Sequence, residues 1–180
     1  MRKLSLLFVV TSLFSLSAFA QSWKLDKSHS AVQFTVTHFV ISSVTGNFKD
    51  YDITFNSSKD DFSDAAVDAT INVSSVNTEN EKRDGHLKSD DFFGVGKFPK
   101  ITFISSEFTK TGDSTYAITG DLTMRDVTKK VTFNAIYAGS IKSPWGNMVA
   151  AWKASTVINR FDYNLKWSAA LETGGLVVGQ

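Results

Sequence analysis

Hydrophobic and polar residues alternate over much of this chain, and that period of two constrains the fold more than any other feature. In AVQFTVTHF, the side chains Val32, Phe34 and Val36 fall on one face while polar residues fall on the other. Successive side chains of a strand point to opposite faces of its sheet, so this pattern is typical of a strand with one buried face. The pattern recurs at residues 65–73, 116–124, 131–137 and 150–154, and Ile101 with Phe103 begins another such segment. The sequence therefore predicts an all-β protein of roughly seven antiparallel strands.

These strands must hide their apolar faces, and two architectures achieve this. They can form two packed sheets, or one sheet that closes on itself as a barrel. Large and very small residues are mixed on the inward faces, for example Ala69 beside Ile71 and Gly120 beside Leu122. This mixture suits side chains that interdigitate in a solid core. It suits equally well a barrel that keeps room for a ligand, so the alternation leaves both architectures open.

The alternation changes phase at one point, between Phe48 and the set Tyr51, Ile53 and Phe55. A regular strand cannot change phase, so a bulge or a bend is expected there. Residues that favour turns separate the other strands, notably at 56–61, 111–113, 125–129 and 143–146.

The first twenty residues have the composition of a secretory signal peptide. Arg2 and Lys3 precede an apolar run from Leu4 to Leu16, and the segment ends on Ala-Phe-Ala before Gln21. The apolar run is too short for a spanning helix, which needs about 20 residues, and no later segment is apolar enough to span a membrane. We expect cleavage before Gln21, a single mature domain at 21–180, and a periplasmic or secreted location.

The composition of the mature chain excludes several functions. Loss of Arg2 and Lys3 leaves 17 basic side chains (19 minus 2) against 18 acidic ones. The resulting formal charge of −1 gives no general attraction to nucleic acid or to an anionic membrane. The chain has no cysteine, which excludes disulfides and thiol chemistry.

One strongly polar segment, EKRDGHLKSDDFF at residues 81–93, interrupts the strands. Thr78 is followed three residues later by Glu81, which is the pattern of a capping box. In such a box each side chain accepts a hydrogen bond from the other residue's free backbone N–H. The pattern predicts a short helix that begins near Glu79.

The end of the same segment combines charge with large apolar side chains. Ser89, Asp90 and Asp91 offer a second helix N-cap just before Phe92 and Phe93. A helical segment this charged cannot lie in the core. We therefore expect a lid, with its charged side in water while the two Phe side chains and Leu87 plug the end of the apolar interior.

Spaced motifs run in order along nearly all of the mature chain. They are Trp23-x-Leu25-Asp26-x-x-His29-Ser30-x-Val32-x-Phe34-x-Val36-x-His38, Ser43-Val44-x-Gly46-x-Phe48, Arg83-Asp84-x-His86-Leu87-x-Ser89-x-Asp91-Phe92-Phe93, Phe98-Pro99-x-Ile101-x-Phe103, Gly120-Asp121-Leu122-Thr123 with Val127-Thr128, and Ile158-Asn159-Arg160. Together they resemble the pattern of the YceI-like family of exported lipid-binding proteins. The resemblance implies a lipocalin-like antiparallel β-barrel with a short helical insertion. It also implies an apolar tunnel that holds a long isoprenoid or another amphiphilic lipid.

With this resemblance, the apolar strand faces become candidate ligand contacts. The expected lining is Phe34, Val36, Phe48, Ile71, Phe103, Leu122, Met124, Phe133 and Trp152, with Leu87, Phe92 and Phe93 at the lid. Moving a hydrocarbon chain from water into such a cavity contributes about 0.8 kcal/mol per CH₂ before the costs of binding. For each of these residues, ordinary core packing is the alternative role.

A polar head group would need hydrogen-bonding partners near the mouth of the tunnel. Arg83, His86 and Arg160 are the candidates for contact with phosphate or another anionic end. Arg83 could equally form a network with Asp84 that ties the lid to the barrel rim. His38 shares the phase of the apolar face and should point inward, either as a hydrogen-bonded core residue or as a head-group contact.

The end of the sequence departs from the family pattern. Members usually continue past a Gly-x-x-Val-Gly segment into a last strand, whereas this sequence stops at Leu176-Val177-Val178-Gly179-Gln180. If the chain ends there, a closing strand is missing and its neighbour keeps unpaired backbone groups. A truncated sequence is the other explanation.

Two other classes of function compete with lipid binding. A metal-dependent enzyme would need ligand or catalytic spacing, but His29 and His38 lie an odd number of residues apart and would face opposite sides of one strand. No HExxH, Gly-x-Ser-x-Gly or glycine-rich phosphate loop occurs, so we expect no catalysis, metal or cofactor. An empty barrel with a structural or stress-response role is the second alternative. The sequence is compatible with a monomer and with a homodimer.

Overall fold

A computed structural model describes residues 21–180, and the proposed signal peptide at 1–20 lies outside the described residues. The described chain is mostly strand, with one α-helix and two short 3₁₀ turns. The strands are β1 (Gln21–Trp23), β2 (Val32–His38), β3 (Ser42–Phe48), β4 (Tyr51–Ser57), β5 (Ala66–Asn72), β6 (Val76–Asn77), β7 (Lys100–Lys110), β8 (Thr115–Met124), β9 (Val127–Lys142) and β10 (Met148–Ser155). The helix is α1 (Glu81–Lys88), and the 3₁₀ turns are η1 (Val73–Ser75) and η2 (Arg160–Tyr163).

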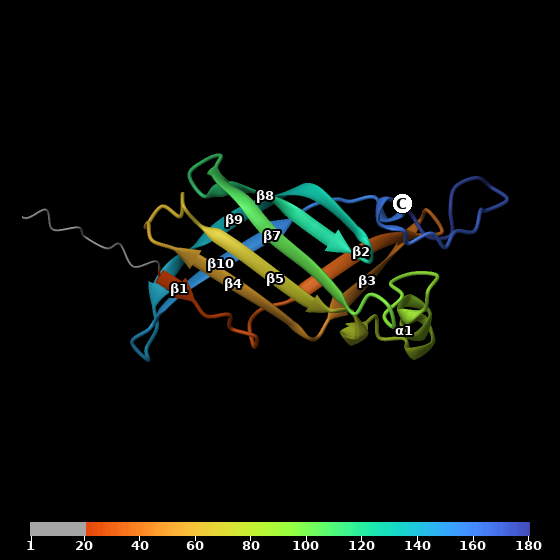
Figure 1. Ribbon diagram of the computed structural model, residues 1–180, viewed down its shortest axis with the longest axis horizontal. Helices are drawn as coiled ribbons and strands as arrows, with labels where there is room; N and C mark the ends of the chain where they lie inside the picture. The colour runs from red at the N-terminus through yellow and green to blue at the C-terminus, as the bar shows by residue number, and fades with distance from the viewer. Residues whose placement is uncertain (1–20) are drawn as a thin grey trace, which may run out of the picture.

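Seven of these strands form one antiparallel sheet in the order β1-β4-β5-β7-β8-β9-β10, and it curls strongly into a lipocalin-like half-barrel (Figure 1). The other three form a small sheet in the order β2-β3-β6. Among residues 21–180 no strand pairing joins the two sheets, which is why the barrel is half open. The all-β, lipocalin-like prediction is confirmed.

Alternation in the sequence becomes alternation of burial in the strands. Along β8, Tyr116, Ile118 and Leu122 are buried, while the side chains between them are mostly more exposed. Along β2 every second side chain, from Val32 to His38, turns inward. The predicted strand segments and the predicted inward phase of His38 are therefore confirmed.

The predicted change of phase after Phe48 marks the passage between the two sheets. Phe48 ends β3 in the small sheet, Lys49 and Asp50 form a bend, and Tyr51 begins β4 in the large sheet. Phe48 and Tyr51 are both buried, at 6% and 7% exposure. The bend lets each strand turn its own apolar face inward, so the prediction of a bend is confirmed.

The capping-box prediction is wrong in its residues, although the helix exists. The N-cap of α1 is Asn80, whose side chain accepts a hydrogen bond from the backbone N–H of Arg83 at 3.0 Å. Asn is among the best N-cap residues, and here it lies one residue before the helix. Thr78 is buried and donates its hydroxyl to Asp84 instead, at 2.6 Å. The helix consequently begins at Glu81, two residues after the Glu79 that the capping box indicated.

The second predicted helix start, at Ser89 to Asp91, is also wrong. Ser89 ends α1 as its C-cap, and its backbone N–H donates to the carbonyl of His86 at 3.1 Å. The residues after Ser89 form turns, in which the N–H of Gly94 returns to the Ser89 carbonyl at 2.8 Å. Gly94 has a φ of +62°, a conformation that suits glycine and reverses the chain without a helix.

The last described residues lie along the free edge of β2. His38 and Val178 form an antiparallel bridge, and Gly179 donates its backbone N–H to the Thr37 carbonyl at 3.0 Å. No helix within residues 21–180 is long and apolar enough to cross a membrane.

Candidate functional site

The concave face of the half-barrel carries a contiguous aromatic cluster. Trp152 on β10 lies at its centre, with ring centroids 4.8 Å from Tyr137, 5.0 Å from Tyr116 and 5.2 Å from Phe62. Phe55 and Phe108 complete the ring of neighbours at 5.6 and 5.7 Å. Rings at these separations pack edge to face or tilted, as aromatic side chains prefer. This cluster fills the end of the half-barrel that is distant from α1.

A second aromatic group lies at the end near α1. Phe34 of β2, Phe48 of β3 and Phe93 lie with centroids 5.7 to 6.4 Å apart. Phe93 is 6% exposed and belongs to the central core. The segment after α1 therefore closes this end of the interior with Phe93, as the lid prediction anticipates.

Many apolar side chains that pack against the core are only half-buried, including Phe34 and Trp152 of the two aromatic groups. Fifteen buried residues form the core cluster, and sixteen further apolar side chains that pack against them keep part of their surface accessible. Of the sequence-predicted lining, Phe34, Val36, His38, Ile71, Leu87, Met124, Phe133 and Trp152 are half-buried, whereas Phe48, Phe92, Phe93, Phe103 and Leu122 are buried. Val36 and His38 do not belong to the sixteen. Part of the apolar surface next to the core is therefore not covered by the protein's own side chains.

The three predicted head-group residues do not gather at one point. Arg83 donates from Nε to the Thr78 hydroxyl and from Nη2 to the Thr78 carbonyl, both at 2.7 Å. Asp84 accepts from the same Thr78, from its N–H at 2.9 Å and from its hydroxyl at 2.6 Å. This arrangement supports the alternative role, in which the pair ties α1 to the end of β6.

Arg160 lies at the start of η2, and its guanidinium is buried among backbone carbonyls. It donates to the carbonyls of Gly179 at 2.6 Å, Leu165 and Trp167 at 2.7 Å, and Val178 at 3.0 Å. Four of its five N–H donors are thus used within the chain. Burial lowers the pKa of this guanidinium from its ordinary value. Arg160 holds the C-terminal segment together, and its contact with a ligand stays a prediction.

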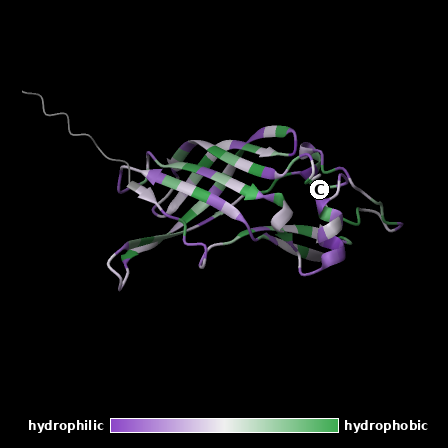
Figure 2. Cartoon of the chain, turned by 60° about the horizontal axis from the view of Figure 1, so that its bottom comes forward, coloured by the Kyte–Doolittle hydropathy of each residue, from purple (hydrophilic) through white to green (hydrophobic). Residues whose placement is uncertain are grey.

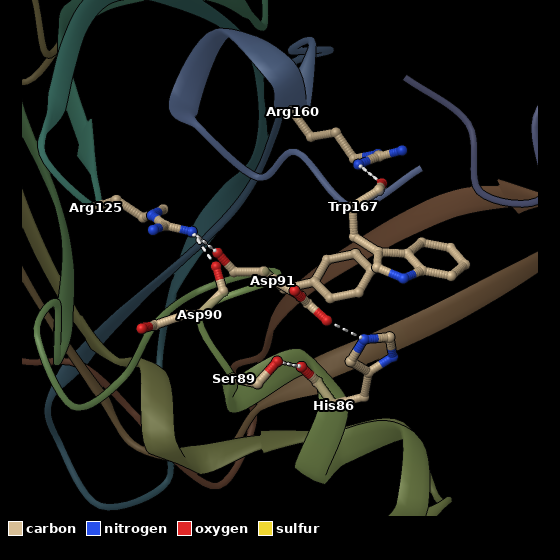
Figure 3. Close-up of polar contacts among 8 residues, drawn as sticks. His86, Ser89, Asp90, Asp91, Arg125, Arg160 and Trp167 are labelled. Atoms are coloured by element: carbon tan, nitrogen blue, oxygen red, sulfur yellow. Dashed lines mark hydrogen bonds and ion pairs between the residues drawn. The ribbon is translucent and has the colours of Figure 1, made fainter. Parts of the chain in front are cut away.

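His86 on α1 lies in a polar corner beside the lid (Figure 3). Its Nε2 lies 3.0 Å from Oδ2 of Asp91, and its ring packs edge-on against Phe92 and Trp167 at centroid distances of 5.0 and 5.4 Å. Phe92 packs in this corner and not in the central core, which separates it from Phe93. His86 does not itself line an open pocket next to this corner, but its neighbours Asp91 and Trp167 do.

That pocket is open and has a volume of about 470 Å³. It is lined by Asp90, Asp91, Arg125, Asp126, Asn164, Lys166 and Trp167. A hydrogen bond from Lys97 lowers the pKa of Asp90, and one from the Asn164 amide lowers the pKa of Asp126. No three His, Asp or Glu side chains within residues 21–180 gather in a way that could hold a metal ion.

Sequence reasoning missed two residues that organise this end of the molecule, Arg125 and Tyr163. Arg125 lies in the two-residue turn between β8 and β9, and its Nη1 donates to the carbonyls of Asp90 at 2.9 Å and of Phe92 (Figure 3). The turn was visible in the sequence, but its contact with a segment more than thirty residues away was not. Tyr163 is 1% exposed, and its hydroxyl finds no hydrogen-bond partner among residues 21–180.

Comparison with known proteins gives consistent results. The model of the YceI-like domain family matches residues 23–180. UPF0312 protein SAS2572 of Staphylococcus aureus (strain MSSA476) is 38% identical over 160 residues, covering 88% of this chain and 91% of the relative. The crystal structure of the Campylobacter jejuni YCEI protein is 37% identical, covers 78% of this chain and 82% of its own, and has a TM-score of 0.64. Burkholderia cenocepacia BcnA, 20% identical over 78% of this chain and 84% of its own, has a TM-score of 0.70 and shares the fold.

Proposed function

Because the chain belongs to the YceI-like domain family, we propose that it is a non-catalytic carrier that binds a long-chain isoprenoid or a similar amphiphilic lipid. The lipid's hydrocarbon chain lies against the concave apolar face of the half-barrel, and α1 with Phe93 covers one end. The signal-peptide composition of residues 1–20 supports export, so we propose that the carrier works in the periplasm or outside the cell.

The observation that carries this proposal is the incomplete burial of the inward apolar side chains. In a solid core such side chains would be closely packed and inaccessible to water. Here sixteen apolar side chains, among them Phe133 and Trp152, pack against the core and yet keep accessible surface. A hydrocarbon chain that covers this surface removes it from water, which contributes about 25 cal/mol per Å² of apolar area.

Such binding selects for length and shape more than for chemical identity. Apolar contacts are not directional, and each additional CH₂ contributes about 0.8 kcal/mol until the available surface is covered. The guanidinium groups of Arg83 and Arg160 already donate within the chain, so the head group of the ligand receives little from them. We therefore expect a ligand whose affinity comes mainly from its tail.

The first test is to identify lipid that accompanies the protein. Protein purified from an exported compartment should carry a lipid that denaturing extraction and mass spectrometry detect. Extraction of refolded protein provides the control for lipid picked up during handling. Finding no lipid in the exported material would favour an empty half-barrel with a structural role.

The second test replaces inward side chains. Phe133→Asp or Trp152→Asp places a charge on the concave face and should abolish uptake of a fluorescent prenyl probe. A bound hydrocarbon chain would remove water from the carboxylate, and the lost hydration of that charge costs more than the apolar contact contributes. Ile104→Asp is the matched control, because Ile104 is 60% exposed and points away from that face. Circular dichroism establishes which variants fold. A folded Phe133 or Trp152 variant with normal uptake would remove that residue from the binding surface.

A further inference from the structure

The hairpin of β9 and β10 extends beyond the body of the half-barrel (Figures 1 and 2). β8 pairs with β9 only up to the pair Thr115 and Ile136. From Gly139 to Lys142, β9 pairs with β10 alone, and the two strands form a ribbon that ends in the loop 143–147. A two-stranded ribbon buries little apolar surface by itself, so its distal side chains are available to a partner.

The distal ribbon exposes four large apolar side chains within nine residues. Trp145 is 89% exposed at the tip, and Ile141 is 71% exposed on the strand that leads to it. Met148 and Val149, on the returning strand, are 47% and 40% exposed. Single exposed apolar residues are common on protein surfaces, whereas contiguous apolar patches mark interaction sites, and here Ile141 lies directly opposite Val149 across the hairpin.

Hydrogen bonds within the loop tie together the residues that present Trp145. The backbone N–H of Ser143 donates to the Asn147 carbonyl at 2.8 Å, and the N–H of Gly146 donates to the Ser143 carbonyl at 3.0 Å. The N–H of Trp145 donates to the Ser143 hydroxyl at 3.3 Å. Gly146 has a φ of +90°, which few other residues adopt. These bonds restrain the loop backbone, which lowers the entropy that ordering it would cost when Trp145 meets a partner.

Charge distinguishes this ribbon from the rest of the chain. No acidic residue occurs between Asp126 and Asp162, whereas Lys142 flanks the tip and Lys153 follows on β10. The whole sequence is nearly balanced, with 19 basic and 18 acidic side chains. The tip thus combines an exposed Trp, aliphatic side chains and lysine, and its own strands carry no carboxylate. That combination matches the interface of an anionic bilayer, where Trp lies at the headgroup level and lysine meets lipid phosphate.

We propose that the tip of the β9–β10 hairpin, residues 141–149, docks on the surface of an anionic phospholipid bilayer. Trp145 and Ile141 enter the boundary between headgroups and acyl chains, and Lys142 contacts phosphate. This goes beyond the proposed lipid binding and does not depend on it, because the tip is exposed whether or not the concave face holds a ligand. For a lipid carrier, docking would bring the half-barrel to the membrane from which its cargo comes.

Vesicle flotation tests the proposal directly. The mature protein should float with vesicles of phosphatidylethanolamine and phosphatidylglycerol, bind phosphatidylcholine vesicles less, and release as salt is raised. Trp145→Ser should weaken binding to the anionic vesicles by roughly tenfold, and Lys142→Gln by roughly threefold. Both residues lie in the exposed tip, so neither change should alter the fold.

The matched control is Ile41→Ser. Ile41 is 91% exposed in the turn between β2 and β3, which has no lysine or arginine between Lys27 and Lys49. This variant should bind vesicles as the unaltered protein does. A second measurement uses brominated phospholipids, which should quench tryptophan fluorescence in the unaltered protein and quench it much less in Trp145→Phe. That difference would place the Trp145 indole in the bilayer.

Three results would overturn the proposal. The unaltered protein could fail to float with anionic vesicles, Trp145→Ser could float equally well, or Ile41→Ser could lose binding to the same extent as Trp145→Ser. Sedimentation velocity tests the alternative partner for the tip, which is a second copy of the chain, by measuring whether the protein forms dimers. A dimer that depends on Trp145, in protein that does not bind vesicles, would assign the tip to self-association. A loss of docking with normal prenyl-probe uptake would leave the proposed carrier function intact.

Discussion

Replacing Arg160 with methionine should destabilise the protein strongly. The guanidinium of Arg160 donates to four backbone carbonyls, two in the loop that follows η2 and two in the C-terminal segment beside β2. No ion pair within residues 21–180 includes Arg160. Its role is therefore to satisfy these carbonyls, and methionine keeps most of the stem volume while removing every donor.

The magnitude follows from the burial of the four acceptors. The hydrogen bond to the Leu165 carbonyl is buried, and an acceptor left there without a partner costs about 1–3 kcal/mol. The other three bonds are partly buried, so water can replace the donor and each net loss is about 0.5–1 kcal/mol. The unfavourable burial of the guanidinium charge is relieved at the same time. We expect the free energy of unfolding to fall by about 3–4 kcal/mol.

Urea unfolding followed by tryptophan fluorescence measures this change. Arg160→Lys is the matched control. The lysine ammonium keeps the positive charge, but it cannot donate to all four carbonyls, which are arranged to fit the planar guanidinium of arginine. It should recover only about half of the loss. A decrease of less than about 1 kcal/mol in Arg160→Met would refute the reasoning, and so would full recovery by lysine, since charge and not the fork would then be sufficient.

Three further predictions concern stability. Tyr163→Phe should raise the free energy of unfolding by about 1 kcal/mol in calorimetry, because it removes a buried hydroxyl that has no hydrogen-bond partner among residues 21–180. A lower Tm for this variant would contradict the prediction and would indicate that a bound molecule accepts or donates a hydrogen bond at this hydroxyl. Gly120→Ala should lower the free energy of unfolding, measured in urea, by about 1–3 kcal/mol, because a Cβ there would lie 2.3 Å from the carbonyl oxygen of Ile104. Gly96→Ala is the control and should change this free energy far less, since a Cβ at Gly96 would have nothing within 4 Å. Hydrogen bonds from two serine hydroxyls hold the pKa of Asp64 below its ordinary 3.8, so its contribution to stability is present above that pH and is lost as the pH falls through the lower folded value. Asp64→Asn should therefore lower Tm at neutral pH, and the deficit should shrink as the pH is lowered below 3.8; a deficit that is constant with pH would contradict this.

Local signals in the sequence located elements better than they located contacts. The alternation around Phe34 and Ile118 predicted strands and their inward faces, because a strand has only two faces and burial selects one. The helix start was misassigned because Thr78 and Asn80 both suit an N-cap. Thr78 is buried by tertiary packing, where Asp84 and Arg83 share its hydroxyl, and Asn80 caps the helix instead.

In the candidate site, too, the sequence predicted which way side chains face but not which groups they contact. The sequence indicated that Phe133 and Trp152 face inward, and the structure confirms that both pack against the core. The sequence could not indicate that the Arg160 guanidinium donates to four backbone carbonyls, because those carbonyls belong to residues up to nineteen positions away. Nor could it connect Arg125 with the carbonyl of Asp90, thirty-five residues earlier in the chain.

By itself the sequence determined the all-β class, the inward face of each long strand and the membership of the family, because these depend on period and on ordered motifs. The tertiary structure alone decided how far the large sheet curls, which apolar side chains stay partly uncovered, and which backbone carbonyls the arginines bind. The physical reason is that facing inward is a property of one strand, whereas being covered depends on what every other segment places opposite it.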